Sequence, residues 1–265
     1  MKFEYKKWFL ENPQFPQNRK SNTIDLWHPA DTETLFKQNL EKYPDSIHLQ
    51  NYLKNPITYS YNNYGFRTSD DFNLKGEGNV FLGCSHTFGI GHHLEDTWVY
   101  KLLQKIGGKN YNISEPGSGI MTQYRYLNYF KDKIKFKNVF HYLPNEDWGR
   151  YEKIKNDKFE GIFPWNDLSN DLIDFLYEDK TIHFINYIFI DAIRYILNEM
   201  GCNYYLVTNG FVHDTNGIPA RDLMHYTTST HTEICDIFYH KYKNNITDNS
   251  DNDILLNELD PRNII

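Results

Sequence analysis

From Asn79 onward the apolar positions follow two alternating periods, which predicts strands separated by helices. Short apolar runs bounded by turn residues indicate buried strands, and apolar positions three and four residues apart indicate helices. We expect strands at 80–82, 111–113, 139–143 and 204–207, and helices at 96–106, 121–134, 182–200 and 228–242. Strands that alternate with helices pair in parallel, so the pattern predicts an α/β protein with a three-layer α/β/α sandwich.

The rest of the chain departs from this pattern. Residues 1–56 carry several prolines and one short helical stretch from Asp31 to Tyr43, and we expect them to form an N-terminal arm that packs on the core. An alternating segment at 57–61 predicts an edge strand. Residues 144–180 look like an irregular insertion. The domain proper is expected at 57–243 and a polar C-terminal tail at 244–265, of which residues 244–253 are expected to be loose.

Composition narrows the class of partner. The 265-residue chain has a net charge of −7 and no cluster of Lys and Arg, which argues against nucleic acid as a partner. No stretch approaches the roughly 20 apolar residues of a membrane span, and residues 1–10 lack the apolar core of a secretory signal. We therefore expect a cytoplasmic protein without membrane attachment. Three cysteines without paired spacing argue against a disulfide framework.

The strongest chemical signal is a serine at the exit of the first core strand. The strand ends in the small-residue turn Gly83-Cys84-Ser85, and a helical pattern follows. A serine hydroxyl becomes nucleophilic when a base removes its proton, and Asp222 and His225 lie three residues apart, close enough for one turn to hold both. Ligands of parallel sheets bind beyond the carboxyl ends of the strands. Four segments fall on that edge: Ser85, the loop of Asp222 and His225, and the residues that follow the strands at 111–113 and 139–143.

These segments resemble four sequence blocks of the SGNH (GDSL-type) hydrolase family. The blocks are Gly83-Cys84-Ser85 with Phe88-Gly89, then Asn112 to Gly117, then Tyr142 to Glu146, and finally Asp222-Leu223-Met224-His225. The resemblance covers roughly residues 57–243 and implies a mostly parallel, flavodoxin-like sheet. It makes Ser85 the nucleophile, His225 the base and Asp222 the acid. It also implies an oxyanion hole built from Ser85, Gly117 and Asn145.

The chain departs from the family pattern at several positions. Cys84 replaces the usual aspartate, Pro144 replaces the glycine before the block-three asparagine, and the closing Gly-His pair is Thr230-His231. The segment Gly65-Phe66-Arg67 resembles one that precedes the serine block in some relatives.

The resemblance implies a serine ester hydrolase that needs no cofactor and acts on a small acyl ester, such as an O-acetylated carbohydrate. An O-acyltransferase with the same triad and a non-catalytic binding module with the same fold remain alternatives. Aromatic residues of the insertion could stack on a sugar, and these are Trp148, Tyr151 and Trp165.

Other chemistry is less well supported by the residues. Cys84 could be the nucleophile in place of Ser85, and the adjacent His213-Asp214 could supply an acid and a base, although adjacent residues hydrogen-bond each other awkwardly. The spacing of His86, His92 and His93 fits no common metal site, so no metal is expected. His231 is expected to pack on the last helix without a catalytic role.

Overall fold

A four-stranded parallel sheet forms the centre of the protein. The computed structural model describes residues 21–68, 70–144, 150–155, 158–162, 181–208 and 217–249. The strands are β3 (Glu77–Gly83), β4 (Asn110–Asn112), β5 (Lys135–Tyr142) and β8 (Asn203–Val207). They lie in the order β4-β3-β5-β8 and are parallel throughout. Counted along the chain this order is 2-1-3-4, as in flavodoxin-like sheets. The prediction of a parallel sheet is confirmed.

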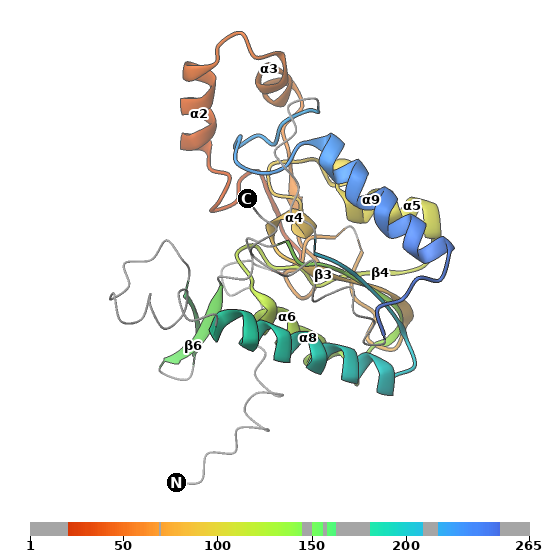
Figure 1. Cartoon of the computed structure of the whole chain (residues 1–265). Helices are drawn as coiled ribbons and strands as arrows, with labels where there is room; N and C mark the ends of the chain where they lie inside the picture. Colours follow the sequence, from red (N-terminus) through yellow and green to blue (C-terminus); the bar gives the residue numbers. More distant parts are fainter. Residues whose placement is uncertain are drawn as a thin grey trace.

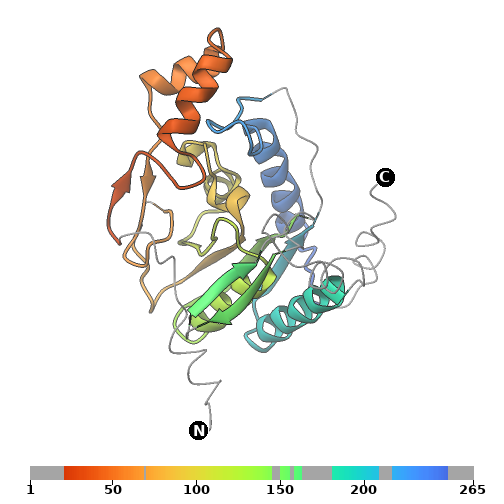
Figure 2. The ribbon, with the colours of Figure 1, turned by 90° about the vertical axis from the view of Figure 1, so that its left-hand side faces the viewer.

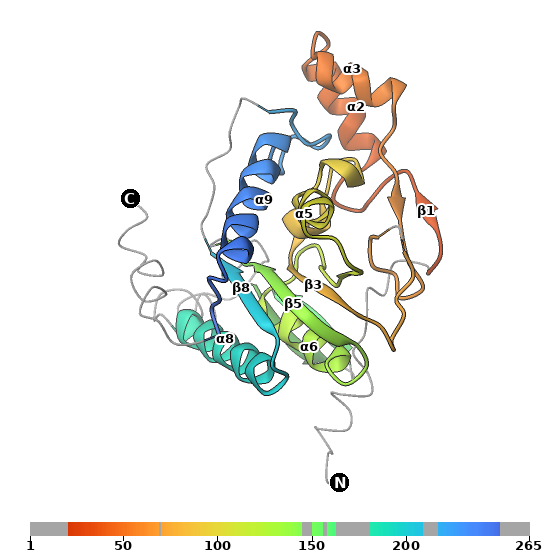
Figure 3. The ribbon, with the colours of Figure 1, turned by 90° about the vertical axis from the view of Figure 1, so that its right-hand side faces the viewer.

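Helices cover both faces of this sheet, which confirms the three-layer α/β/α arrangement (Figure 1). One face carries α6 (Ile120–Phe130) and α8 (Thr181–Glu199), and the opposite face carries α5 (Trp98–Ile106) and α9 (Thr228–Lys243). Figure 3 shows the two pairs on either side of the strands. No helix in the described ranges is long and apolar enough to cross a membrane.

The alternation of side chains along β3 divides the core in two. Val80 and Leu82 pack in the cluster beneath α6 and α8. Phe81 points to the opposite face, where its ring lies 5.7 Å from Trp98 and 5.4 Å from Phe140. Successive side chains of a strand point to opposite faces, so an unbroken apolar run is what a strand buried on both faces requires.

Several predicted boundaries were wrong at the ends. Helix α5 has Thr97 as its N-cap, whose hydroxyl accepts from the Tyr100 N–H, whereas Asp96 lies in the preceding 3-10 turn η1 (Leu94–Asp96). Helix α6 begins at Ile120 and ends at Phe130, short of the expected Ile134.

The expected irregular insertion at 144–180 contains regular structure in its described part. Strands β6 (Tyr151–Lys155) and β7 (Lys158–Ile162) pair antiparallel as a hairpin. The partly buried carboxylate of Glu152 accepts from Arg125 at 2.5 Å and from the Thr122 hydroxyl at 2.7 Å, both on α6. The hairpin is therefore held against α6 by a charged pair. The period of the apolar residues does not predict such a contact.

The N-terminal arm packs on the sheet domain through its own apolar cluster (Figure 2). It contains β1 (Ile24–Asp25), α2 (Glu33–Lys42) and α3 (Ile47–Lys54), and β1 pairs antiparallel with β2 (Tyr59–Ser60). Helix α3 was not predicted. Side chains of the arm meet Phe88 and Ile90, which follow the serine turn.

The described beginning of the C-terminal tail is anchored, contrary to the expectation of a loose segment. The Asp248 carboxylate accepts from the Leu206 N–H at 2.8 Å, and the Asn249 side chain accepts from the Tyr204 N–H at 2.9 Å. These are N–H groups of β8, the last strand of the sheet. Unpaired N–H groups of an edge strand need acceptors, and polar side chains supply them here.

Candidate active site

The serine turn depends on a glycine at the end of β3. Gly83 has a φ of 151°, and a Cβ there would lie 2.0 Å from the Thr87 hydroxyl oxygen and 2.8 Å from the Tyr142 carbonyl oxygen. Only glycine fits this position. Ser85 then opens the short helix α4 (Ser85–Phe88), with Cys84 as its N-cap. Ser85 is 6% exposed, and its hydroxyl donates to the Cys84 sulfur at 3.9 Å. The Cys84 thiol is buried beside the hydroxyl.

Arg67 stabilises the backbone that follows Ser85. Its guanidinium donates to the carbonyl oxygens of Phe88 and Gly89 at the end of α4, and to that of His92 at 2.7 Å. Cations are favoured at helix C-terminal carbonyls, and here the contact is fully buried. The segment Gly65-Phe66-Arg67 noted in the sequence therefore supports the serine turn directly.

Asp222 and His225 form a hydrogen-bonded pair on the loop before α9. The Asp222 carboxylate accepts from His225 Nδ1–H at 2.5 Å and from the N–H groups of Met224 and His225 at 3.0 and 3.2 Å. Burial acts to raise the pKa of Asp222, but these three donors outweigh it and hold the pKa below its ordinary value. The carboxylate therefore stays ionised at neutral pH, and it leaves Nε2 of His225 as the nitrogen that can accept a proton.

The pair lies next to the serine turn. The His86 ring, one residue beyond Ser85, lies 5.3 Å from the His225 ring and stacks on Tyr226 at 3.8 Å. The described hydrogen bonds include none between Ser85 Oγ and His225 Nε2. Catalytic hydrogen bonds are often long in ligand-free enzymes and tighten when substrate binds. Ser85 and the acid–base pair thus come together at one edge of the sheet.

Gly117 lies in the loop between β4 and α6, with a φ of 78°. The loop is pinned to the strand that ends before Ser85, because the Glu115 N–H and the Ser118 hydroxyl both donate to the Gly83 carbonyl, at 3.1 and 3.2 Å. Within the described ranges, no hydrogen bond uses the N–H of Ser85 or of Gly117. No described residue supplies an acceptor for either of these two N–H groups, which lie on neighbouring segments.

A buried chain of polar groups supports this loop from inside the core. Gln123 donates to the Ser118 hydroxyl at 3.2 Å and accepts from His141 Nε2 at 2.6 Å. Burial lowers the pKa of His141 to about 3, so the ring is neutral, and Nδ1 accepts from the Tyr204 hydroxyl at 2.7 Å. Each group in this series donates a hydrogen bond to the next, from the Tyr204 hydroxyl to the Gly83 carbonyl. Only one arrangement of the hydrogen atoms satisfies all of these bonds, so the loop has a single set of partners.

Two further histidines pack beneath the pair without joining it. His92 Nε2–H donates to the Tyr226 carbonyl at 2.6 Å, and burial lowers the His92 pKa to about 4. His231 Nδ1 accepts from the Trp98 N–H at 3.3 Å, and burial beside His92 holds its pKa well below the ordinary value. Both are neutral supports at physiological pH, and His231 packs as expected. The described residues contain no group of three or more ligands that could hold a metal ion.

Some predicted residues lie outside the described ranges. They are Asn145, the alternative pair His213 and Asp214, and Trp148 and Trp165 of the suggested sugar platform. The third block is described up to Pro144, which follows the end of β5.

Sequence reasoning missed the supporting polar residues, namely Arg221, Asp31, Gln123, His141 and Ser118. One weak signal was present. Gln123 and Arg125 are polar residues on the inward face of a helix, and buried polar side chains need partners. The sequence did not say which partners those would be.

Comparisons with known proteins gave structural similarity only. No family model and no curated protein matches the sequence. One similar solved structure is a protein described as lipolytic and of the G-D-S-L family from Desulfitobacterium hafniense, with 16% identity, a TM-score of 0.33, and 65% of this chain and 74% of that chain covered. A second is an acetyl xylan esterase from the rumen bacterium Butyrivibrio proteoclasticus, with 11% identity, a TM-score of 0.40, and coverage of 67% and 66%.

A third similar structure is a carbohydrate esterase whose active site is described as having divergent catalytic and non-catalytic binding functions, with 9% identity, a TM-score of 0.34 and coverage of 67% of each chain. The chain spans about two thirds of these esterases. The fold assignment does not depend on such distant similarities. The α/β/α fold of this chain follows from its own sheet order and from the helices that cover both faces of the sheet.

Proposed function

We propose that the protein is a serine ester hydrolase in which Ser85 is the nucleophile, His225 the general base and Asp222 the residue that orients the base. One observation carries the proposal. Asp222 and His225 make their hydrogen bond at 2.5 Å, beside the turn that presents Ser85. An oriented imidazole next to a serine at a strand exit is the arrangement that activates a hydroxyl.

In the proposed mechanism, Ser85 Oγ attacks the acyl carbonyl while His225 Nε2 takes its proton. Asp222 remains ionised and stabilises the imidazolium, and its three donors keep the charge in place. His225 then gives the proton to the leaving alcohol. Water attacks the acyl-enzyme with His225 again as base, which restores the Ser85 hydroxyl and releases the acid.

The oxyanion that forms in each step would accept from the N–H groups of Ser85 and Gly117. Neither group has a partner within the described part of the chain, which supports the proposal. The Asn145 side chain is proposed as a third donor. Loss of one such donor typically lowers turnover about 10²–10³-fold.

The proposed substrate is a small acyl ester, and an O-acetylated carbohydrate is the first class to test. This choice rests on the resemblance of the four sequence blocks to the SGNH hydrolases. Two substrates test the chemistry and the substrate class separately, namely p-nitrophenyl acetate and acetylated xylo-oligosaccharides. Activity on the nitrophenyl ester tests the chemistry, and release of acetate from the sugar tests the substrate class.

The test compares Ser85→Ala with the intact protein and with Ser114→Ala as a matched control. Ser114 is another buried serine that follows a core strand, and its hydroxyl has no hydrogen-bond partner among the described residues. We expect Ser85→Ala to lose hydrolysis and fluorophosphonate labelling while Ser114→Ala keeps both. Equal rates in Ser85→Ala and the intact protein would refute the proposal.

The same assays distinguish an O-acyltransferase. Addition of a free sugar would then divert the acyl group from water to the sugar, and mass spectrometry would detect the acylated sugar instead of free acetate. A non-catalytic binding module would show neither product and no adduct on Ser85.

A further inference from the structure

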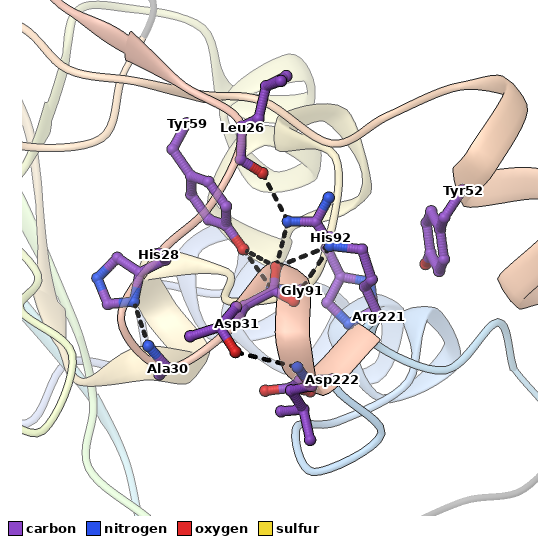
Figure 4. A network of polar contacts seen from close by, with 12 residues as sticks. Leu26, His28, Ala30, Asp31, Tyr52, Tyr59, Gly91, His92, Arg221 and Asp222 are labelled. Carbon is purple, nitrogen blue, oxygen red and sulfur yellow. Dashed lines mark hydrogen bonds and ion pairs between the residues drawn. The ribbon is translucent and has the colours of Figure 1, made fainter. Parts of the chain in front are cut away.

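The N-terminal arm reaches the loop that carries Asp222 and His225. Pro219, Arg221 and Asp222 of this loop contact α3, the segment between β1 and α2, and α2. Figure 4 shows the contact of Arg221 with the segment between β1 and α2. We infer that the arm is part of the active site, because it fixes the position of the acid–base pair relative to Ser85. This inference rests on the proposed function and adds positioning residues that the triad does not contain.

The main contact is a buried ion pair between Asp31 of the arm and Arg221, the neighbour of Asp222. Arg221 donates to Asp31 through Nε at 3.0 Å and Nη2 at 2.7 Å, and Nη2 also donates to the Leu26 carbonyl at 2.8 Å. The two side chains are 0% and 1% exposed. The guanidinium lies 4.0 Å from the centre of the Trp27 ring. A planar guanidinium held by two acceptors and a ring face has one orientation, so it fixes the chain at residue 221.

Two side chains of the arm hold the backbone of the loop itself. Asn39 of α2 donates to the carbonyl oxygens of Arg221 and Asp222, at 3.3 and 3.2 Å. Tyr52 of α3 donates from its hydroxyl to the Pro219 carbonyl at 2.9 Å. These contacts reach the acid residue directly but leave its carboxylate free for His225.

Asp31 of the arm is also linked, through Tyr59, to the segment that follows the nucleophile. The Tyr59 hydroxyl donates to Asp31 at 2.5 Å and accepts from the Gly91 N–H at 2.9 Å, and the Arg221 N–H donates to the Gly91 carbonyl at 2.8 Å. A Cβ on Gly91 would lie 2.8 Å from the Ala220 side chain and 2.9 Å from the Arg221 nitrogen. The loop therefore approaches the nucleophile segment at backbone contact distance, with Asp31 bonded to both sides through Tyr59 and Arg221.

The position of the imidazole depends on two kinds of contact, one within the loop and one between the loop and the arm. The Asp222–His225 bond joins residues three positions apart and forms within one turn. This bond sets the tautomer of the imidazole. The distance from that imidazole to Ser85 depends on where the whole loop lies, and the arm contacts determine this. A displacement of about 1 Å between reacting groups can lower a rate about 10²-fold.

The test uses two mild substitutions, each with a matched control in the full chain. Asn39→Ala removes the two contacts to the loop, whereas Gln50→Ala removes a side-chain contact that stays within the arm, from Gln50 to the Pro44 carbonyl. Tyr52→Phe removes only the hydroxyl at Pro219, whereas Tyr111→Phe removes a hydroxyl that donates to Asn73, away from the site. Hydrolysis of p-nitrophenyl acetate is measured from pH 5 to 9, together with thermal unfolding and circular dichroism.

We expect Asn39→Ala and Tyr52→Phe to lower kcat about tenfold relative to their controls. KM and the midpoint of the kcat/KM pH profile should stay the same, because the Asp222–His225 bond is local. A purely structural role would lower the melting temperature but leave kcat of the folded protein unchanged. Rates within twofold of the controls would overturn the inference while Ser85→Ala is still inactive. If Ser85→Ala retains full activity, the proposed function fails instead, whatever the arm variants show.

Discussion

The buried pair of Asp31 and Arg221 makes a quantitative prediction about stability. Replacing Asp31 by Leu leaves the Arg221 guanidinium, which is 1% exposed, without its charged partner. Breaking a buried pair from one side costs about 3–5 kcal/mol, because the remaining charge stays desolvated. At roughly 2–4 °C per kcal/mol for a chain of about this size, the melting temperature should fall by roughly 10 °C.

The double variant Asp31→Leu/Arg221→Met distinguishes this reason from general damage to the core. Trp27 and Phe36 already border the guanidinium, at 4.0 and 5.8 Å from their ring centres, so a methionine there meets apolar surroundings. Replacement of a whole buried pair by apolar residues is often neutral or stabilising. The Tyr59 hydroxyl loses its acceptor in both the single and the double variant, so this loss cancels when the two are compared.

Urea unfolding followed by tryptophan fluorescence measures the cycle of Asp31→Leu, Arg221→Met and the double variant. We expect the double variant to be more stable than either single variant, which gives a coupling energy of at least about 2 kcal/mol. If the cost of the double variant equals the sum of the two single costs, the charges are not coupled and the argument is wrong.

Three other outcomes follow from the same geometry. Asp222→Asn keeps the shape of the acid but removes its charge, so kcat for p-nitrophenyl acetate should fall about 10⁴-fold, and a loss below tenfold would contradict the proposed role. Gln123→Leu breaks the polar chain under the Gly117 loop, and calorimetry should show a loss of about 1–3 kcal/mol, with unchanged stability as the contrary result. The free energy of unfolding should also fall as the pH drops below about 6.5, by up to about 1.4 kcal/mol per pH unit for each buried, neutral histidine ring. Below that pH the histidines of the unfolded chain bind protons, whereas the buried rings stay neutral. These rings are His92, His141 and His231. Urea unfolding at pH 7, 6 and 5 measures the loss of stability, and equal stability at pH 7 and pH 5 would rule out this prediction.

The sheet and its helices could be predicted from the sequence because burial leaves a periodic trace. A strand covered on both faces, such as β3, contains an unbroken apolar run from Val80 to Leu82, and the helices that cover it repeat their apolar positions every three or four residues. Helix ends were less certain. Thr97 and Asp96 are both good caps by residue type, and only the geometry selects Thr97.

The candidate site was predictable where its contacts are short in sequence. Asp222 and His225 are three positions apart, and the glycine turn before Ser85 is contiguous. The supports of the site were not predictable in this way. A buried Asp31 or Gln123 has the same letter as an exposed one, and polar residues carry no period that would mark them as paired.

By itself the sequence determined the parallel sheet and the edge at which its loops converge, and it predicted the residues at that edge that we propose for acyl chemistry. Local rules suffice for these features, because periodic burial and turn geometry act over a few residues. Only the tertiary structure decided that Asp31 would meet Arg221, 190 positions away, and thereby join the N-terminal arm to the acid–base loop. Such a pair is selected by the cost of leaving either charge buried alone, and that cost arises only when the folded chain brings the two side chains out of water together.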